Sequence, residues 1–267
     1  KAAVSVSDGI VTVDYAGSSR QIPAALTVAY SYTHAMTVYA LKCLLDPESP
    51  NNEGSHRALR VVAPEGSLVN HSPPYSGGNR ALVGHYLPGL VLAALAPMMP
   101  DKVMAGVGSP MWSFLLRGRD AAGRPFTLKT FFNGGMGALA HRDGLHATSW
   151  PSNICGAPIE VIEQSAPIRV LTRRLRRGSG GMGRFRGGDG LEIEIEFLAG
   201  GPFTIGFNAE RTKSPAKGLF GGGDGATGEI LLNGAPIDIR EVLSPRSGDR
   251  LTIRTPGGGG YGAPGAQ

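Results

Sequence analysis

The feature that most constrains this chain is the glycine-rich stretch at residues 178–190, which reads GSGGMGRFRGGDG. Each glycine has more backbone freedom to lose on folding than any other residue, so a run of them is costly. A folded chain accepts that cost where the backbone needs a positive φ or must approach another group closely. We therefore expect the backbone of residues 178–190 to be tightly turned or closely packed.

The same stretch contains the pattern G-x-G-x-x-G at Gly178, Gly180 and Gly183. In a dinucleotide-binding site a helix starts directly after these glycines, so that its N-terminus faces the pyrophosphate. Here a second group of glycines follows, and then residues 191–197 (LEIEIEF), whose apolar and acidic residues alternate as in a half-buried strand. The sequence favours a glycine-rich connection between two strands over a nucleotide site.

Composition places the chain among globular proteins. Of its 267 residues 41% are hydrophobic and 18% are charged, while 41 glycines and 20 prolines predict many short strands and turns. The net charge of +5 is largely due to the arginines within residues 173–177. So local an excess does not indicate nucleic-acid binding, and it leaves open a phosphate ligand, an acidic partner surface or a solvated strand end.

The two cysteines, Cys43 and Cys155, give neither a disulfide framework nor a metal-binding spacing, so we expect a cytoplasmic protein. The sequence begins at Lys1 without a signal peptide, which suggests a fragment or a processed portion of a longer protein. Residues 24–41 carry no charged side chain, but Thr27, Ser31 and His34 form a polar stripe typical of a buried helix, and we expect no membrane span.

Periodicity and turn signals predict an α+β fold. Two buried helices are expected in the N-terminal part, at 24–45 and 80–97, and the C-terminal half should be rich in strands and glycine loops. The expected strands are 2–7 and 10–15, joined at Asp8-Gly9, followed by 59–63, 111–118, 126–132, 159–163, 168–175, 191–197, 203–207, 229–232 and 250–254. If the chain has two parts, we expect an α+β part at 1–165 and a β-rich part at 166–267.

Few residues form a recognisable catalytic pattern. His141, Asp143 and His146 are potential catalytic groups or metal ligands, although Gly144 makes a polar turn the simpler interpretation. Asn51, Asn52 and Asn133 would suit a polar substrate, or else would only bond their own backbone. The sequence has no G-x-S-x-G, H-E-x-x-H or phosphate-loop motif.

The order of the loops along the whole chain resembles that of the hydantoinase B/oxoprolinase family. The matching segments are 13–18 (VDYAGS), 40–45 (ALKCLL), 50–54 (PNNEG), 61–70 (VVAPEGSLVN), 133–137 (NGGMG), 142–144 (RDG), 153, 158–160 (PIE), 180–188 (GGMGRFRGG) and 255–262 (TPGGGGYG). A full member of this family is about twice as long as this chain. The resemblance therefore implies that residues 1–267 are the C-terminal portion of such a subunit.

The resemblance implies one side of an ATP-dependent cyclic-amide hydrolase. A partner subunit like hydantoinase A would bind ATP with magnesium and phosphorylate the amide oxygen of a hydantoin, 5-oxoproline or another lactam. Water activated by a divalent metal ion would then open the ring. The family's metal ligands belong to the N-terminal half of the B subunit, so no metal is expected in this chain, and the isolated chain is expected to be inactive.

Within this chain the resemblance leaves supporting roles. The loops containing Gly134, Gly135 and residues 178–190 would line the substrate passage or receive phosphate oxygens, and Arg184, Arg186 and Asp189 would bind phosphate or substrate. The glycines alternatively only permit tight turns against the other half. Two other functions remain open: a subunit of an ATP-dependent ketone carboxylase, and a non-catalytic module that docks a partner subunit.

Overall fold

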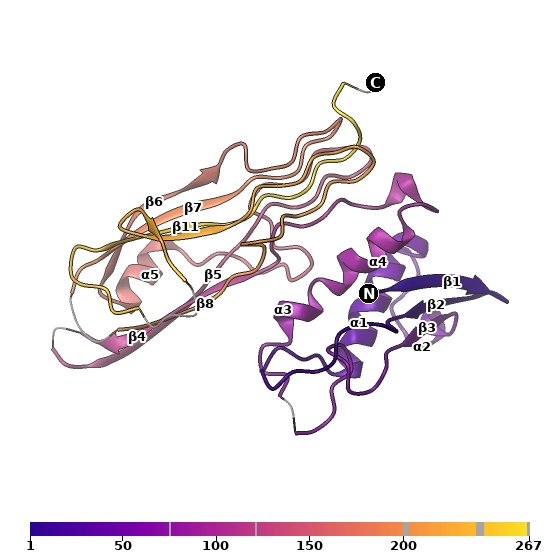
Figure 1. Ribbon diagram of the computed structural model, residues 1–267, viewed down its shortest axis with the longest axis horizontal. Helices are drawn as coiled ribbons and strands as arrows, with labels where there is room; N and C mark the ends of the chain where they lie inside the picture. Colours follow the sequence, from indigo (N-terminus) through magenta and orange to yellow (C-terminus); the bar gives the residue numbers. More distant parts are fainter. Residues whose placement is uncertain (75, 121, 200–202, 239–242, 266–267) are drawn as a thin grey trace. The chain divides into compact units, whose positions relative to one another are not determined.

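The computed structural model describes residues 1–74, 76–120, 122–199, 203–238 and 243–265 (Figure 1). Its helices are α1 (Tyr30–Leu45), α2 (Glu53–His56), α3 (Ala81–Gly84), α4 (Leu87–Leu95), α5 (Ile159–Ser165) and a short 3-10 turn (Pro100–Lys102). Its strands are β1 (Ala3–Ser7), β2 (Ile10–Asp14), β3 (Leu59–Val62), β4 (Trp112–Arg119), β5 (Pro125–Phe132), β6 (Ile168–Arg176), β7 (Gly190–Phe197), β8 (Thr204–Asn208), β9 (Glu229–Leu232), β10 (Ala235–Pro236) and β11 (Arg250–Arg254). The α+β prediction is confirmed.

The chain forms two compact units, Lys1–Met104 and Ala105–Gln267. The boundary therefore lies earlier than a division after residue 165. The reason is strand pairing, because β4 bonds to β8, which lies more than eighty residues further along the chain. Residues 105–165, which include β4 and β5, consequently belong to the second unit. No helix among the described residues is long and apolar enough to cross a membrane.

The first unit packs helices against a three-stranded sheet in the order β1-β2-β3. Asp8 and Gly9 both have positive φ, 51° and 76°, as the two-residue turn predicted between β1 and β2 requires. The buried phenol of Tyr15 lies 2.7 Å from the hydroxyl of Thr37 on α1 and so links that helix to the end of β2. This polar contact explains how α1 tolerates buried threonines.

The helices in the structure are shorter than the ranges predicted for them from the sequence. α1 begins at Tyr30 rather than at 24, because residues 23–26 form a bend and turn, Ala29 is extended, and Val28 donates its N–H to the carbonyl of Leu68 at 2.8 Å. The helix expected at 80–97 is divided into α3 and α4. Pro88, which lies in the first turn of α4, has no N–H to donate to the preceding turn, so one continuous helix cannot form.

One predicted strand is wrong: residues 159–163 lie in the helix α5. Ile162 is 4% exposed whereas Val161 is 51% exposed, and the helix begins directly after Pro158. A seven-residue segment with one buried apolar residue carries too little periodicity to separate a helix from a strand. Packing against β5 and β6 decides its conformation.

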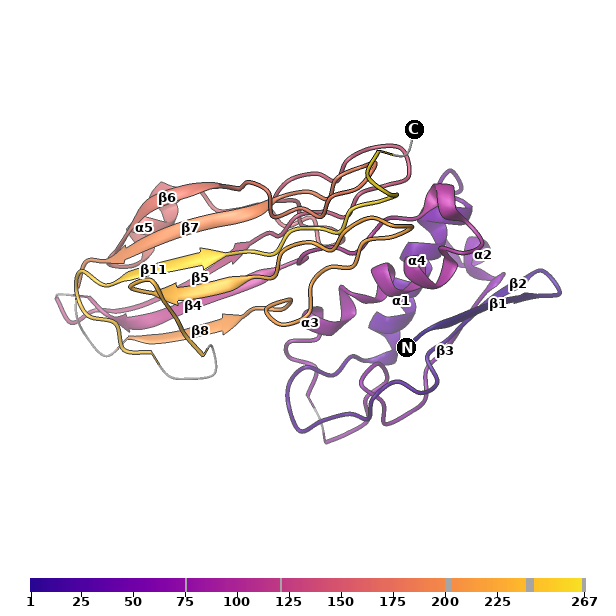
Figure 2. The ribbon, with the colours of Figure 1, turned by 45° about the horizontal axis from the view of Figure 1, so that its top comes forward.

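The second unit contains two sheets, β10-β9-β11-β7-β6 and β5-β4-β8, whose facing sides form one hydrophobic core (Figures 1 and 2). Trp112, Phe114 and Leu116 of β4 meet Ile193 and the other inward residues of β7 in this core. The alternation seen in residues 191–197 is thus confirmed, with isoleucines inside and glutamates outside. Helix α5 packs against the edge strands β5 and β6 of the two sheets.

At one end of this sandwich the strands continue into extended glycine-rich segments that lie side by side, visible in both ribbon views (Figures 1 and 2). We call residues 105–110, 133–138, 178–189, 216–226 and 255–262 the glycine bundle. Residues 257–260 form its buried centre. Their amides donate in turn to the carbonyls of Ala226, Gly188, Gly106 and Gly223, over 2.8 to 3.1 Å.

The direction of these bonds repeats every three residues, since Gly257 and Gly260 both donate to the segment 216–226. A strand would repeat every two residues, whereas a polyproline-II-like segment has three residues per turn. One segment can therefore bond to neighbours in three directions. The predicted glycine-rich connection between two strands is present between β6 and β7, and it supplies extended segments to the bundle.

The close packing of backbone segments in the bundle explains why so many of its residues are glycine. A Cβ on Gly257 would lie 1.9 Å from the carbonyl oxygen of Ser179, and one on Gly258 would lie 2.1 Å from that of Met136. A Cβ on Gly135 would lie 1.7 Å from the carbonyl oxygen of Gly188. These neighbours are backbone atoms that cannot rotate away, so only glycine fits.

Candidate functional site

The structure brings together two loops that the sequence singled out separately. The loop of His141, Asp143 and His146 lies alongside residues 184–189. Asp143 accepts a hydrogen bond from the N–H of Arg186 at 2.7 Å, and Gly144 donates its N–H to the carbonyl of Arg186 at 2.8 Å. We call residues 141–146 and 184–189 the loop pair. It lies on the surface of the glycine bundle, and its side chains at positions 141, 143, 146, 184 and 186 are exposed.

His146 and Asp189 make a further contact within the loop pair. The N–H of Asp189 donates to Nδ1 of His146 at 2.8 Å, so this nitrogen is unprotonated and a neutral ring carries its proton on Nε2. The Asp189 carboxylate lies 3.7 Å from the same nitrogen and accepts the N–H of Gly180 at 2.9 Å. Because the Asp189 side chain is 8% exposed, it holds the loops together more than it faces solvent.

Like Arg142, the side chains of Arg184 and Arg186 are cationic and open to solvent. The guanidinium of Arg184 lies 5.4 Å from the ring centre of Phe185, at a distance suited to a cation–π contact. Among the described residues neither arginine is part of an ion pair. Both guanidinium groups therefore retain their donors for a phosphate or carboxylate.

The candidates Asn133, Gly134 and Gly135 lie inside the bundle. Gly134 and Gly135 donate their N–H groups to the carbonyls of Ser109 and Pro256, at 3.0 and 2.9 Å. The amide of the Asn133 side chain donates to the carbonyl of Ile154 at 3.0 Å. Packing and internal hydrogen bonds thus occupy the glycine amides, and a phosphate would reach them only if those bonds opened.

Asn51 and Asn52 lie in the first unit and make local bonds. Asn52 caps α2, since its side-chain oxygen accepts the N–H of Ser55 at 3.1 Å. The side-chain oxygen of Asn51 lies 2.6 Å from Nε2 of His56. Asn52 therefore bonds nearby backbone, whereas Asn51 contacts the side chain of His56.

The residues present do not fit a metal centre. Across the described ranges, no three His, Cys, Asp or Glu side chains are grouped so that they could hold one ion. In the loop pair, Nδ1 of His146 and the carboxylates of Asp143 and Asp189 already accept backbone N–H groups. We therefore derive no step through a metal from these residues.

Sequence reasoning missed Glu210, which follows β8 and lies beside the bundle. Burial raises the pKa of its carboxyl group to about 7, although the hydroxyl of Ser109 donates to it at 3.1 Å. Such a group can exchange a proton near neutral pH. Nothing in the sequence around Glu210 indicates this, because burial depends on segments about one hundred residues away.

Arginines of the run at 173–177 form ion pairs on the outer face of the five-stranded sheet. Glu192 accepts hydrogen bonds from Arg174 at 2.9 Å and from Arg254 at 2.7 Å. Glu229 then accepts from Arg254 at 3.1 Å and from Arg176 at 3.0 Å. We call these five side chains the ion-pair row; it crosses β6, β7, β11 and β9.

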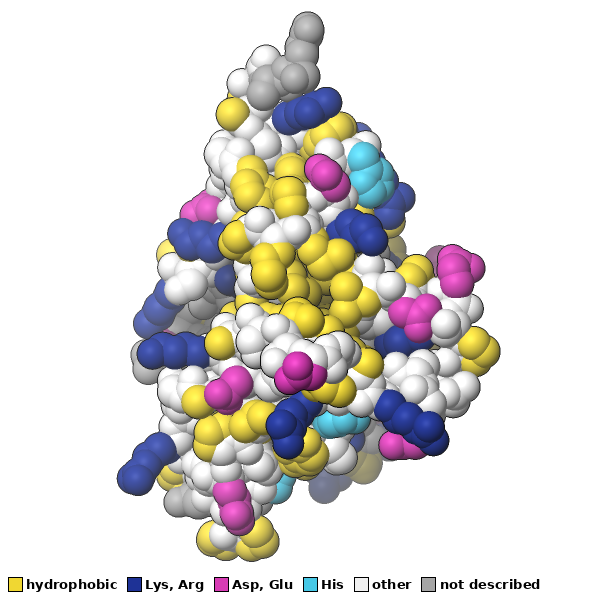
Figure 3. Space-filling model, turned by 90° about the vertical axis from the view of Figure 1, so that its right-hand side faces the viewer, with side chains coloured by type: hydrophobic (Ala, Val, Ile, Leu, Met, Phe, Trp, Pro, Cys, Tyr) yellow, Lys and Arg dark blue, Asp and Glu magenta, His cyan; other side chains and the backbone are white. Residues whose placement is uncertain are grey.

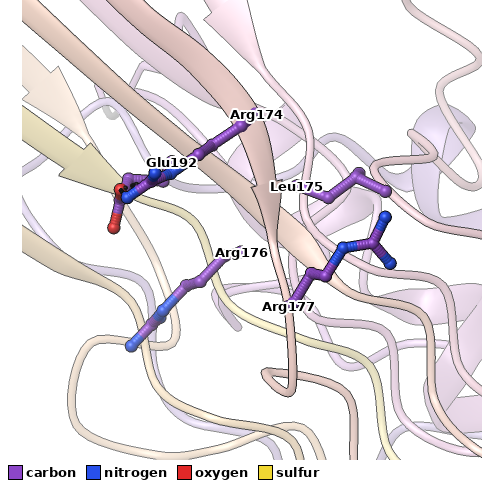
Figure 4. Close-up of a pocket in the computed structure, with 5 residues that line it drawn as sticks. All are labelled: Arg174, Leu175, Arg176, Arg177 and Glu192. Carbon is purple, nitrogen blue, oxygen red and sulfur yellow. Dashed lines mark hydrogen bonds and ion pairs between the residues drawn. The ribbon is translucent and has the colours of Figure 1, made fainter.

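Figure 4 shows Arg174 and Arg176 on the side of Glu192, with Leu175 and Arg177 pointing the other way, as strand alternation requires. These residues line a hollow of about 530 Å³. Arg174 and Arg176, two of the four arginines in the run, are already paired with glutamates of the sheet. This arrangement favours the solvated strand end over a phosphate site.

Comparison with known proteins assigns the family. The family model described as hydantoinase B/oxoprolinase matches residues 1–264. The chain belongs to the hydantoinase B/oxoprolinase family. Its resemblance to this family, inferred from the loops, is therefore confirmed.

Three relatives define how much of a family member this chain represents. Protein MJ0963 of Methanocaldococcus jannaschii is 34% identical over 268 residues, which cover 98% of this chain and 46% of that protein. The putative B subunit of a D-/L-hydantoinase from Pseudomonas sp. strain NS671 is 29% identical over 276 residues, again 98% and 46%. The crystal structure of the ATP-dependent caprolactamase from Pseudomonas jessenii aligns with a TM-score of 0.82 and 25% identity, over 98% of this chain and 48% of that one. The chain thus spans about half the length of these hydantoinase B/oxoprolinase relatives.

Proposed function

We propose that this chain is the C-terminal half of the B-type subunit of an ATP-dependent enzyme that opens cyclic amides. The observation that carries the proposal is the likeness to the ATP-dependent caprolactamase, whose fold matches 98% of this chain. The relative named as the B subunit of a hydantoinase supports the same substrate class, since hydantoins and caprolactam both contain a ring amide.

The chemistry explains why ATP is needed. An amide carbonyl is a poor electrophile, and transfer of a phosphoryl group to its oxygen makes the ring carbon easier to attack. The net reaction converts a lactam, ATP and two water molecules into the open-chain amino acid, ADP and phosphate, because ring opening and the loss of the phosphoryl group each consume one water. We assign ATP binding to a separate subunit like hydantoinase A, and the metal-activated water to the half of the B subunit that this chain does not include.

For this chain we propose binding and positioning roles. Arg184 and Arg186 are exposed, cationic and free of ion pairs within the described residues, so they suit the phosphate or carboxylate of a reaction species. Asp143 accepts the N–H of Arg186, and this bond fixes the backbone from which the Arg186 side chain extends. The glycine bundle supplies the rigid support, because its backbone hydrogen bonds leave little freedom at residues 257–260.

The test is reconstitution with the remaining half of a B subunit and an A-type subunit. Addition of hydantoin, 5-oxoproline or caprolactam should stimulate ADP release and ring opening, and the chain alone should do neither. The double variant Arg184→Ala/Arg186→Ala should lower kcat/KM at least about tenfold, whereas the control Arg177→Ala should not. Unchanged turnover of the folded double variant would rule out the ligand role. Stimulation by acetone with bicarbonate, and by no lactam, would replace the proposal by a ketone carboxylase.

A further inference from the structure

The strand β1 forms one edge of the three-stranded sheet β1-β2-β3. An edge strand presents unpaired N–H and C=O groups, and proteins usually blunt such an edge with charges, bulges or a covering segment. β6, the edge of the five-stranded sheet, carries arginines and a bulge between Val170 and Thr172. β1 reads AVSVS, with no charged residue and no proline.

The other edge of the same sheet is covered. β2 donates to β3 from Val11 and Tyr15, which bond to the carbonyls of Ala58 and Val62. The carbonyl of Val61 therefore points away from β2, and the hydroxyl of Tyr30 on α1 donates to it at 3.0 Å. β3 also carries the charged Arg60. The contrast leaves β1 as the open edge of this sheet.

The hairpin geometry identifies the unpaired groups on β1. In a two-residue hairpin the residues that flank the turn, here Ser7 and Ile10, form a hydrogen-bonded pair. Pairs then alternate along the ladder, so Val6 opposite Val11 is a non-hydrogen-bonded pair. The N–H of Val11 donates to the carbonyl of Ala58, the residue before β3, which agrees with this alternation. Val4 and Val6 consequently point their N–H and C=O groups away from β2.

The apolar face of the sheet is also incompletely covered next to this edge. The row Val4, Val13 and Val61 runs under the helices, and Val13 is 0% exposed. In the adjacent row, formed by Val6, Val11 and Leu59, Val6 is 64% exposed. Figure 3 views the molecule from the right-hand side of Figure 1, and hydrophobic side chains lie open to solvent in that view.

We propose that β1 is a docking edge that pairs with a strand from the other half of the family's polypeptide. The length of the relatives supports this occupant, because this chain covers 46% of MJ0963 and 48% of the caprolactamase chain. More than half of each relative is thus available to supply a strand. The strand would bond to Val4 and Val6 and place an apolar side chain beside Val6. This inference rests on the proposed division of the B subunit into two halves. It identifies β1 as a place where the two halves would be in contact.

The test is co-expression of this chain with the part of MJ0963 outside the matching region, followed by amide hydrogen exchange. The amides of Val4 and Val6 should exchange rapidly in the chain alone and at least about tenfold more slowly in the complex. The measurement requires no turnover, so a failed activity assay would contradict the proposed function and leave this result intact.

Two variants of β1 sharpen the test. Val6→Pro removes the outward N–H without touching the bonds between β1 and β2, and Val6→Lys places a charge on the open apolar row. Each should weaken the complex at least about tenfold. The control Val62→Lys, at a 41% exposed valine on the covered edge, should not.

Three results would overturn the proposal. One is that no complex forms on co-expression. Another is a complex in which Val4 and Val6 exchange as fast as in the chain alone. The third is protection of β1 that depends on the concentration of this chain alone, since this would make a second copy the occupant.

Discussion

The N–H of Asp189 donates to Nδ1 of His146 at 2.8 Å and so joins two loops that lie 43 residues apart in the sequence. His146→Ala removes this acceptor and leaves a buried backbone donor without a partner, at a cost of about 1 to 2 kcal/mol to the loop pair. We expect the Asp189 amide to exchange its hydrogen faster in the variant. His141→Ala, at an exposed position of the same loop, is the control and should leave that amide unchanged.

The packing role of the central glycines can be tested at Gly258. A Cβ there would lie 2.1 Å from the carbonyl oxygen of Met136, so Gly258→Ala should lower the free energy of unfolding by about 3 kcal/mol. Gly206→Ala is a matched control, because its Cβ would make an ordinary contact with Leu115 at 3.8 Å and should change stability by less than about 1 kcal/mol. Denaturant unfolding measures both. Equal effects would mean that the bundle is loosely packed.

Glu210 should make stability depend on pH near neutrality. Burial raises the pKa of its carboxyl group from 4.5 to about 7, so the folded state holds a proton that the unfolded state releases. Its contribution is fully present below the unfolded pKa and is lost as pH rises through about 7, a change of about 3 kcal/mol. Unfolding at several pH values should show this decline in the wild type. Glu210→Gln should lack it, and an identical decline in that variant would exclude Glu210 as its source.

The ion-pair row should depend most on Glu192, which joins Arg174 and Arg254. Burial alone would raise the pKa of the Glu192 carboxyl, but hydrogen bonds from Arg254 and Arg174 hold that pKa below its ordinary value. Its stabilisation is therefore present at neutral pH and lost as pH falls through the folded pKa. Glu192→Gln should lower the free energy of unfolding at pH 7 by about 1 to 2 kcal/mol.

Glu196→Gln is the control for this row. Glu196 pairs with Arg169 at 3.8 Å, and that arginine side chain is 62% exposed, so its loss should cost about 0.5 kcal/mol or less. Thermal unfolding of the two variants at the same ionic strength compares them directly. A larger effect at Glu196 would contradict the assignment of the row.

The strands could be predicted wherever a local pattern is strong. Alternation in β7 and the Asp8-Gly9 turn identify their elements because period and turn type depend on a few neighbouring residues. The same approach failed for α5, where a single buried isoleucine gives no period. It also predicted too early a start for α1, because the chain before Tyr30 turns at residues 23–26 and then bonds from Val28 to the distant Leu68.

Some features of the candidate site could likewise be predicted from the sequence, and others could not. Histidine, aspartate and arginine in two glycine-rich loops could be chosen from their chemistry, and the structure places Asp143 and Arg186 in contact. That Gly134 and Gly135 have their amides occupied could not be predicted, because their acceptors belong to segments more than twenty residues away. The family resemblance came from the order of the loops, and the match over residues 1–264 confirms it.

The sequence by itself determined which segments must be glycine, which strands alternate and to which family the chain belongs, since these follow from residue types and local order. Only the tertiary structure decided that the glycines form a bundle, that Glu210 is buried and that β1 is left as an open edge. The physical reason is that hydrogen-bond partners, burial and edges are properties of segments brought together from distant parts of the chain.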